Sequence, residues 1–127
     1  MNSIFVYGLL KPGFRLHHIA EPYVLRWAPA RVRGRLYDAG SSEASPSDRL
    51  PAARFDEDGE IEGFVFWLDE ARLDEALAVL DDLEDEGTEY RRIVVPASTA
   101  DDTVEAFAYE YLPAVDPGRF VGPTWPE

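Results

Sequence analysis

The chain has 127 residues, which is the size of one domain that buries a core without disulfides or a metal. Twelve basic residues stand against twenty-five acidic ones, and the formal net charge of -13 repels nucleic-acid phosphates and anionic lipids. There is no cysteine, which excludes thiol nucleophiles and cysteine zinc sites, and no apolar run reaches transmembrane length. We therefore expect a single domain, 1-127, that is cytoplasmic and has no nucleic-acid or membrane partner.

The first predicted element is a strand from Ser3 to Tyr7, which Gly8 ends. Leu9 and Leu10 then continue the apolar run up to a Lys-Pro-Gly turn at 11–13. A signal peptide does not fit, because no basic residue precedes the run and no small-residue cleavage site follows it. We expect a buried strand that leads into a functional backbone turn.

The middle of the chain predicts short elements separated by turns. Residues 15–25 indicate a helical turn before a proline, and residues 30–40 alternate apolar residues with arginines, as a strand does. Residues 41–48 are polar and turn-rich, which is typical of an exposed loop. Residues 51–69 read as a β-hairpin around an Asp-Gly turn at 58–59.

One long helix is predicted over 68–87, with Asp69 as its N-cap and Gly87 as its stop. Two strands, 90–97 and 103–112, follow it around an Asp-Asp turn, and residues 113–127 hold too much proline and glycine for regular structure. These elements predict an α+β domain with a small mixed or antiparallel, barrel-like sheet, one main helix and a short second helix. The helix's apolar positions are Leu73, Ala76, Leu77, Leu80 and Leu83.

One carboxylate stands on the apolar side of this helix. Glu84 follows Leu77 by seven residues and Leu80 by four, so it lies within roughly 45° of the centre of the apolar stripe. One possibility is that the helix frays near Gly87 and the carboxylate reaches solvent or pairs with an arginine such as Arg91 or Arg92. The other is that the carboxylate is partly buried and serves as an acid or base. In the second case burial and neighbouring negative charges raise its pKa. The neighbouring acids are Asp81, Asp82, Asp85 and Glu86.

Two segments resemble the gamma-glutamylcyclotransferase-like family: "FVYGLLKPG" near the amino end and "LDDLEDEGTEYRRIVVPA" later in the chain. That family begins Val-Tyr-Gly-Thr/Ser-Leu before a glycine turn and carries a catalytic glutamate at a helix end, followed by Tyr-x-Arg. "GRLYDAG", "EGFVFWL" and "AFAYEYL" resemble its other strands, so the likeness covers essentially the whole chain. The resemblance implies the family's barrel-like fold and a cofactor-free intramolecular acyl transfer that releases 5-oxoproline.

The resemblance also assigns roles to individual residues. Glu84 matches the general acid/base, and the matched turn is one that holds the substrate through backbone groups. The turn residues are Tyr7, Gly8, Leu9 and Leu10. Tyr90 and Tyr109 are candidate pocket hydroxyls, with ordinary strand packing as the alternative. The implied partner is a small gamma-glutamyl substrate, no metal is expected, and we expect a monomer or weak homodimer.

The chain departs from the family's pattern in ways that leave alternatives open. Leu9 replaces the usual threonine or serine, and the longer, more polar segment 40–51 is predicted to be an exposed loop at the pocket mouth. His17 and His18 are adjacent, which is poor spacing for a metal pair. Lys11 lies near the turn but equally fits the surface. The alternative function is a non-catalytic module that binds an amino-bearing small molecule, and a purely structural domain is the third possibility.

Overall fold

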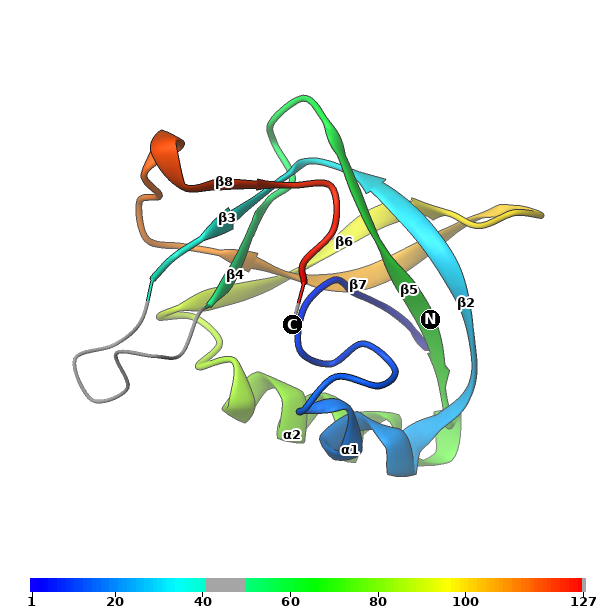
Figure 1. The fold of residues 1–127 in the computed structure, drawn as a ribbon. Helices are drawn as coiled ribbons and strands as arrows, with labels where there is room; N and C mark the ends of the chain where they lie inside the picture. The colour runs from blue at the N-terminus through cyan, green and yellow to red at the C-terminus, as the bar shows by residue number, and fades with distance from the viewer. Residues whose placement is uncertain (41–49, 127) are drawn as a thin grey trace.

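A five-stranded barrel forms the centre of the computed structural model, which describes residues 1–40 and 50–126 (Figure 1). The strand order is β1-β5-β2-β6-β7, and all neighbours are antiparallel except β1 and β7, which close the barrel in parallel. The predicted α+β barrel is therefore confirmed. The barrel strands are β1 (Ser3–Val6), β2 (Val24–Arg33), β5 (Glu60–Leu68), β6 (Tyr90–Ser98) and β7 (Thr103–Tyr111).

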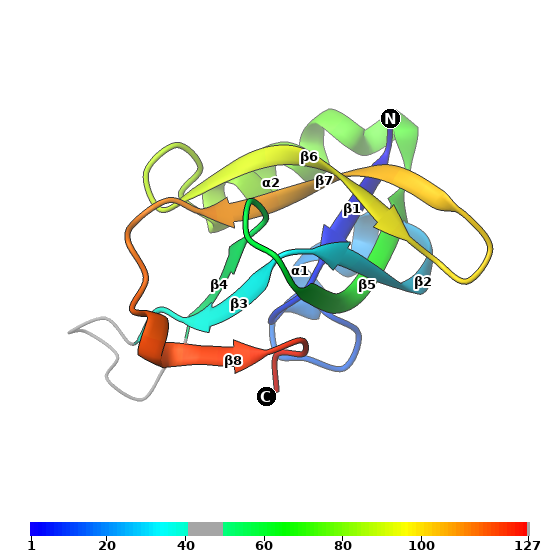
Figure 2. The same ribbon diagram turned by 90° about the horizontal axis from the view of Figure 1, so that it is seen from above.

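A second, three-stranded sheet stands beside the barrel, in the order β4-β3-β8 (Figure 2). It consists of β3 (Arg35–Asp38), β4 (Pro51–Arg54) and β8 (Phe120–Gly122), and both pairings with the central β3 are antiparallel. β4 also places Pro51 beside the turn after β1, where the candidate site lies.

The predicted hairpin over 51–69 is wrong, because its two strands lie in different sheets. β4 pairs with β3, whereas β5 pairs with β1 and with the whole length of β2. The predicted strand over 30–40 divides at Gly34, whose φ of +149° redirects the chain from β2 into β3. The N–H of Gly34 donates to the carbonyl of Gly59, so the Asp-Gly turn stands at the junction of the sheets.

The C-terminal segment is also more ordered than its composition predicts. Asp116 caps a 3₁₀ turn at Pro117–Arg119, and β8 follows directly. Trp125 is then buried, with 2% of its surface exposed. The prediction of no regular structure failed because β8 is fixed by the edge of β3, a partner about eighty residues away that local composition does not reveal.

Two helices lie side by side below the barrel (Figure 1). The predicted short turn is α1 (His17–Ala20), which a 3₁₀ turn extends. Asp69 caps a 3₁₀ turn by accepting a 3.0 Å hydrogen bond from the Ala71 N–H, and α2 (Leu73–Leu83) follows. The helix is shorter than predicted, because Glu84 is already its C-cap. No helix among the described residues is long and apolar enough to span a membrane.

The side chains of α2 join the barrel through one of two apolar clusters. Ala76 and Leu80 are the buried residues of the helix, and they belong to the same cluster as Ile4, Val6 and Phe66 of the barrel. The other cluster is built largely from small residues of β6 and β7 with larger ones of β1 and β5. Burial of Leu80 fixes the carboxyl end of α2 against β1 and thereby positions Glu84.

The junction between the two sheets should depend on Gly34. A Cβ at this position would lie 2.6 Å from the Arg54 carbonyl oxygen, on a backbone that L-residues rarely adopt. We expect Gly34→Ala to lower the free energy of unfolding by about 2–4 kcal/mol in urea titrations. Gly13→Ala is the matched control: its φ is +83°, but nothing lies within 4 Å of the new Cβ, so about 1 kcal/mol is expected. Equal losses of unfolding free energy in Gly34→Ala and Gly13→Ala would contradict the packing argument.

Candidate active site

A cavity of about 410 Å³ lies between the turn after β1 and the end of α2. All the sequence-predicted site residues line it: Tyr7, Gly8, Leu9, Leu10, Glu84, Tyr90 and Tyr109. Further walls come from Arg15, Leu50, Pro51 and Glu89, among others. The structure thus brings residues of the two motifs together, although their individual roles remain predictions. Residues 41–49, where the loop at the pocket mouth was predicted, lie outside the described residues.

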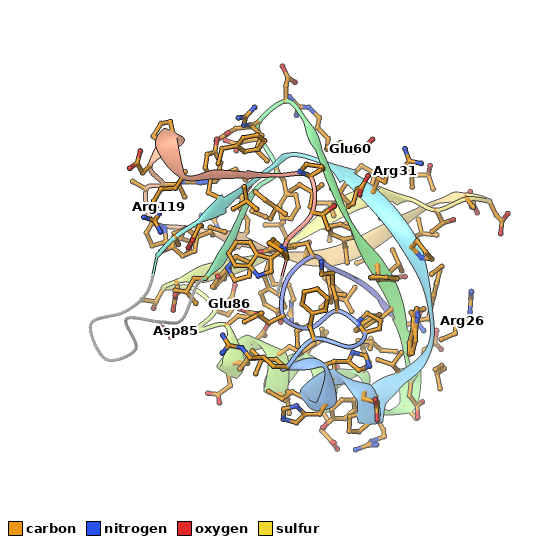
Figure 3. All side chains as sticks on the ribbon, viewed as in Figure 1. Arg26, Arg31, Glu60, Asp85, Glu86 and Arg119 are labelled. Carbon is orange, nitrogen blue, oxygen red and sulfur yellow. The ribbon has the colours of Figure 1, made fainter. Side chains whose placement is uncertain are left out.

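The turn after α2 places Glu84 in the cavity wall. The Glu84 N–H still donates to the Leu80 carbonyl at 2.9 Å, so this residue continues the last helical turn. Asp85 then reverses the chain with a φ of +49°, and its carbonyl accepts the Glu89 N–H at 3.0 Å. Figure 3 shows Asp85 and Glu86 at this reversal. The helix end is closed by hydrogen bonds, which contradicts the interpretation that it frays before Gly87.

Burial changes the acidity of Glu84. The side chain is half-buried, and loss of water around the carboxyl group raises its pKa from 4.5 to about 7. The negative charge of Glu89 adds to this rise. The sequence predicted like-charge contributions from four nearer acids, and that attribution is wrong. Glu89 was missed because it lies beyond the helix, where helical spacing has no meaning, and only the reversal at Asp85 brings it to the cavity.

Among the described residues, no arginine forms an ion pair with this carboxyl group. Arg92 instead forms an ion pair with both oxygens of Asp81, at 2.9 and 3.1 Å, and its N–H donates to Glu86. Asp81 also accepts the Tyr109 hydroxyl at 2.6 Å. Within the described part of the chain, no hydrogen bond contributes to the Glu84 pKa. Its carboxyl group is therefore available to a molecule in the cavity.

The turn opposite Glu84 presents its amides. The Gly8 carbonyl accepts the Lys11 N–H at 3.2 Å, and the Leu9 carbonyl accepts the Leu16 N–H at 3.1 Å. Among the turn and loop hydrogen bonds of the described residues, none uses the N–H groups of residues 8–10 as donors. Amides arranged in this way favour a negatively charged ligand.

Gly8 has a packing reason to be glycine. A Cβ there would lie 2.6 Å from Cγ of Pro51, so the missing side chain admits the first residue of β4 into the cavity wall. The close approach that Gly8 allows in this structure is that of Pro51.

The hydroxyl groups of the three cavity tyrosines donate hydrogen bonds to other groups of the protein. Tyr7 donates to the Tyr109 carbonyl and Tyr90 donates to the Pro51 carbonyl, each at 2.6 Å, while Tyr109 donates to Asp81. Burial is the main cause that raises the pKa of all three phenols above their ordinary value. These hydroxyls therefore remain protonated near neutral pH and hold the cavity walls in place.

Lys11 is buried, which contradicts the surface alternative. Its Nζ donates to the Trp125 carbonyl at 2.7 Å and lies 4.3 Å from the centre of the Phe14 ring. The C-terminal segment is thereby held against the turn after β1, as the adjacent red and blue traces in Figure 1 show. The sequence carries no signal for this contact, because its two residues are 114 positions apart.

A larger hollow, of about 1240 Å³, lies between β2, β5 and the tip of the β6–β7 hairpin. Arg31 and Glu60 lie side by side at its edge, 3.7 Å apart (Figure 3), and Arg33 pairs with Asp58 at 2.6 Å. These two pairs of charged groups satisfy one another on an exposed surface. The smaller cavity holds available amides and a carboxyl group that has no ion-pair partner among the described residues, and it is the candidate site. Among the described residues, no cluster of three metal-ligating side chains occurs.

Several solved structures have the same fold as this chain. An AIG2-like protein from Mus musculus has a TM-score of 0.68 and 24% identity, with 94% of this chain and 82% of that chain covered. An uncharacterised protein from Pyrococcus horikoshii has a TM-score of 0.65 and 24% identity, covering 95% and 86%. A structure described as a gamma-glutamyl cyclotransferase has a TM-score of 0.63 and 17% identity, covering 87% and 66%.

The family model "Gamma-glutamyl cyclotransferase, AIG2-like" matches residues 4–125. The chain therefore belongs to this family, as the two motifs of the sequence predicted. A comparison with curated proteins found no significant match.

The raised pKa of Glu84 has a consequence for stability. Between pH 4.5 and about 7 the folded state binds the proton more tightly than the unfolded chain, so wild-type stability falls as pH rises through this window. Glu84→Gln removes the charge and should be more stable than wild type at pH 8, by about 1–3 kcal/mol. The difference should vanish below pH 4.5. Asp82→Asn, an exposed acid on the same helix, should show no such pH-dependent gain in urea titrations. A Glu84→Gln protein that is less stable at pH 8 would contradict this assignment.

Proposed function

We propose that this protein is an enzyme that releases 5-oxoproline from a gamma-glutamyl amine or peptide, with Glu84 as the general acid/base. The observation that carries the proposal is a half-buried carboxyl group with a pKa of about 7 and no ion-pair partner among the described residues, in the same cavity as a turn with available amides. Membership of the family supports the reaction class, and the leaving group is not specified by any residue identified so far.

In the proposed reaction the substrate supplies its own nucleophile. Glu84 takes a proton from the substrate's α-ammonium group, and the resulting amine attacks the side-chain carbonyl carbon. A carbon–nitrogen bond forms and closes the five-membered ring, while the bond to the leaving amine breaks. Glu84 gives this proton to the departing nitrogen, accepts the second proton that the ring nitrogen loses when the lactam forms, and passes it to the released amine, which leaves as an ammonium ion. The enzyme therefore ends in its starting state. Because the nucleophile is tethered, the protein's task is to select a folded-back conformation and to move two protons from the ring nitrogen to the leaving group.

The amides of residues 8–10 would bind a negative group of the substrate. This group is either the α-carboxylate or the oxygen that becomes negative when the ring closes. The tyrosine hydroxyls have protein partners, so their contribution is the shape and dryness of the cavity. A dry cavity strengthens the attraction between the carboxylate and the ammonium group that it must deprotonate.

A non-catalytic binding module is the second candidate. It is favoured by Leu9, whose side chain lines the cavity and packs on the core, at a position where the family resemblance leads one to expect a hydroxyl. The two candidates differ in product. Incubation with gamma-glutamyl amines, gamma-glutamyl dipeptides and glutathione should yield 5-oxoproline if the protein is an enzyme. Tight binding of these compounds without any turnover would favour the module.

Replacement of Glu84 by glutamine tests its catalytic role. The amide keeps the shape of the side chain but accepts no proton, so we expect kcat to fall by about 10²–10⁴-fold while binding changes little. The measurement is 5-oxoproline release under single-turnover and steady-state conditions. Asp82→Asn, at the same helix end, should retain wild-type kcat. Wild-type turnover by the Glu84→Gln protein would remove the mechanism.

The pH dependence of kcat/KM should report the same group. The carboxylate is the base, so kcat/KM should rise about tenfold per pH unit below an inflection near the Glu84 pKa of about 7, and then level off. Glu89→Gln removes the like charge that helps to raise this pKa and should move the inflection to lower pH. An inflection that Glu89→Gln leaves in place would show that Glu89 does not act on the ionising group.

A further inference from the structure

His17, the first residue of α1, is hydrogen-bonded to Leu10, the last residue of the Gly8–Leu10 turn. Its Nδ1 lies 2.9 Å from the carbonyl oxygen of Leu10, and the imidazole is buried, with 7% of the residue exposed. A carbonyl oxygen only accepts hydrogen bonds, so Nδ1 must carry the hydrogen. The neighbouring His18 makes a similar bond, 3.0 Å to the Arg15 carbonyl, but on the exposed side of the helix.

This bond controls the orientation of a peptide plane within the turn. Because a trans peptide is rigid, the carbonyl of Leu10 and the N–H of Lys11 point in opposite directions, and holding one fixes the other. The Lys11 N–H donates to the Gly8 carbonyl, which in turn shares its peptide plane with the Leu9 N–H. One side-chain hydrogen bond therefore reaches, through two peptide planes, the N–H of Leu9, a residue that lines the cavity.

Packing alone does not account for a histidine at this position. The ring meets the edges or faces of Trp27 and Phe66 in T-shaped contacts, with centroid distances of 5.7 and 5.4 Å, as a phenylalanine would. A histidine also buries Nε2, which finds no hydrogen-bond partner within the described part of the chain and lies 3.5 Å from a Glu21 oxygen. An unsatisfied buried nitrogen is unfavourable. The imidazole differs from a phenylalanine ring in that its Nδ1 can donate a hydrogen bond.

We propose that His17 is a positioning residue, which orients the amides of the Gly8–Leu10 turn through the carbonyl of Leu10. This rests on the proposed function only in so far as those amides bind substrate. His17 itself does not touch the reacting atoms. Its ring is held in the form that carries hydrogen on Nδ1, and Trp27 and Phe66 prevent the ring from turning away.

Three substitutions separate positioning from packing. His17→Leu fills the space without a donor, whereas His17→Asn keeps an N–H donor at the δ position. We expect kcat/KM for 5-oxoproline release to fall by about 10- to 100-fold in His17→Leu and to stay within about threefold of wild type in His17→Asn. His18→Leu is the matched control and should leave kcat/KM unchanged. Equal kinetics for His17→Leu and His18→Leu, or a folded His17→Asn as poor as His17→Leu, would overturn the proposal.

Two readouts do not depend on activity. Two-bond ¹H–¹⁵N correlation of the wild-type imidazole should show hydrogen on Nδ1, and a ring with hydrogen on Nε2 alone would overturn the proposal. Amide hydrogen exchange at Lys11 should be faster than wild type in His17→Leu but not in His17→Asn. Equal exchange rates in the two variants would also overturn the proposal. If wild-type protein released no 5-oxoproline, the proposed function would fail while these two measurements would still decide the role of His17. If His17→Leu does not fold, the imidazole correlation still decides the proposal, because it is measured on the wild-type protein alone.

Discussion

The removal of water from one carboxyl group is the constraint on which this site depends. A half-buried Glu84 that has no cationic partner among the described residues is energetically unfavourable, and the surrounding contacts hold it in this position. Leu80 anchors the end of α2 in the core, Asp85 reverses the chain in a conformation that residues other than glycine rarely adopt, and Pro51 closes the wall opposite. Arg92, which the sequence offered as a partner for Glu84, is bound to Asp81. The result is a carboxyl group whose pKa lies near the pH at which proton transfer is most effective.

The polar groups of the cavity fall into two sets: some are hydrogen-bonded inside the protein, and others are available to a ligand. Tyrosine hydroxyls and the carbonyls of the turn find partners inside the protein, so they shape the cavity without being free to react. Among the described residues, the groups that stay available include the carboxyl group of Glu84 on one wall and the amide donors of residues 8–10 on the other. Such a pair suits a substrate that carries both an ammonium group and a group that becomes more negative during the reaction. A tethered amine that attacks its own acyl group meets both conditions.

Local patterns in the sequence predicted much of the site but less of the fold. The strand that ends at Gly8 and the place of Glu84 in an apolar helical stripe are properties of short segments, so they were readable without a structure. The hairpin over 51–69 was wrong because strand pairing is decided by partners far away in the chain, and the break at Gly34 sends β3 to the second sheet. The C-terminal strand and the burial of Lys11 depend on contacts across the length of the chain. Glu89 became part of the site only through the reversal at Asp85.

The most direct test of the central claim is an NMR titration of the protein with 5-oxoproline, the proposed product. Backbone ¹⁵N signals of residues 8–10 and the side-chain carboxyl ¹³C signal of Glu84 would be followed in the same samples. The account predicts that the amides of the Gly8–Leu10 turn and the carboxyl group of Glu84 respond together, at the same ligand concentration. Shifts that instead mapped to the hollow between β2, β5 and the β6–β7 tip, with Glu84 and the turn unchanged, would contradict it.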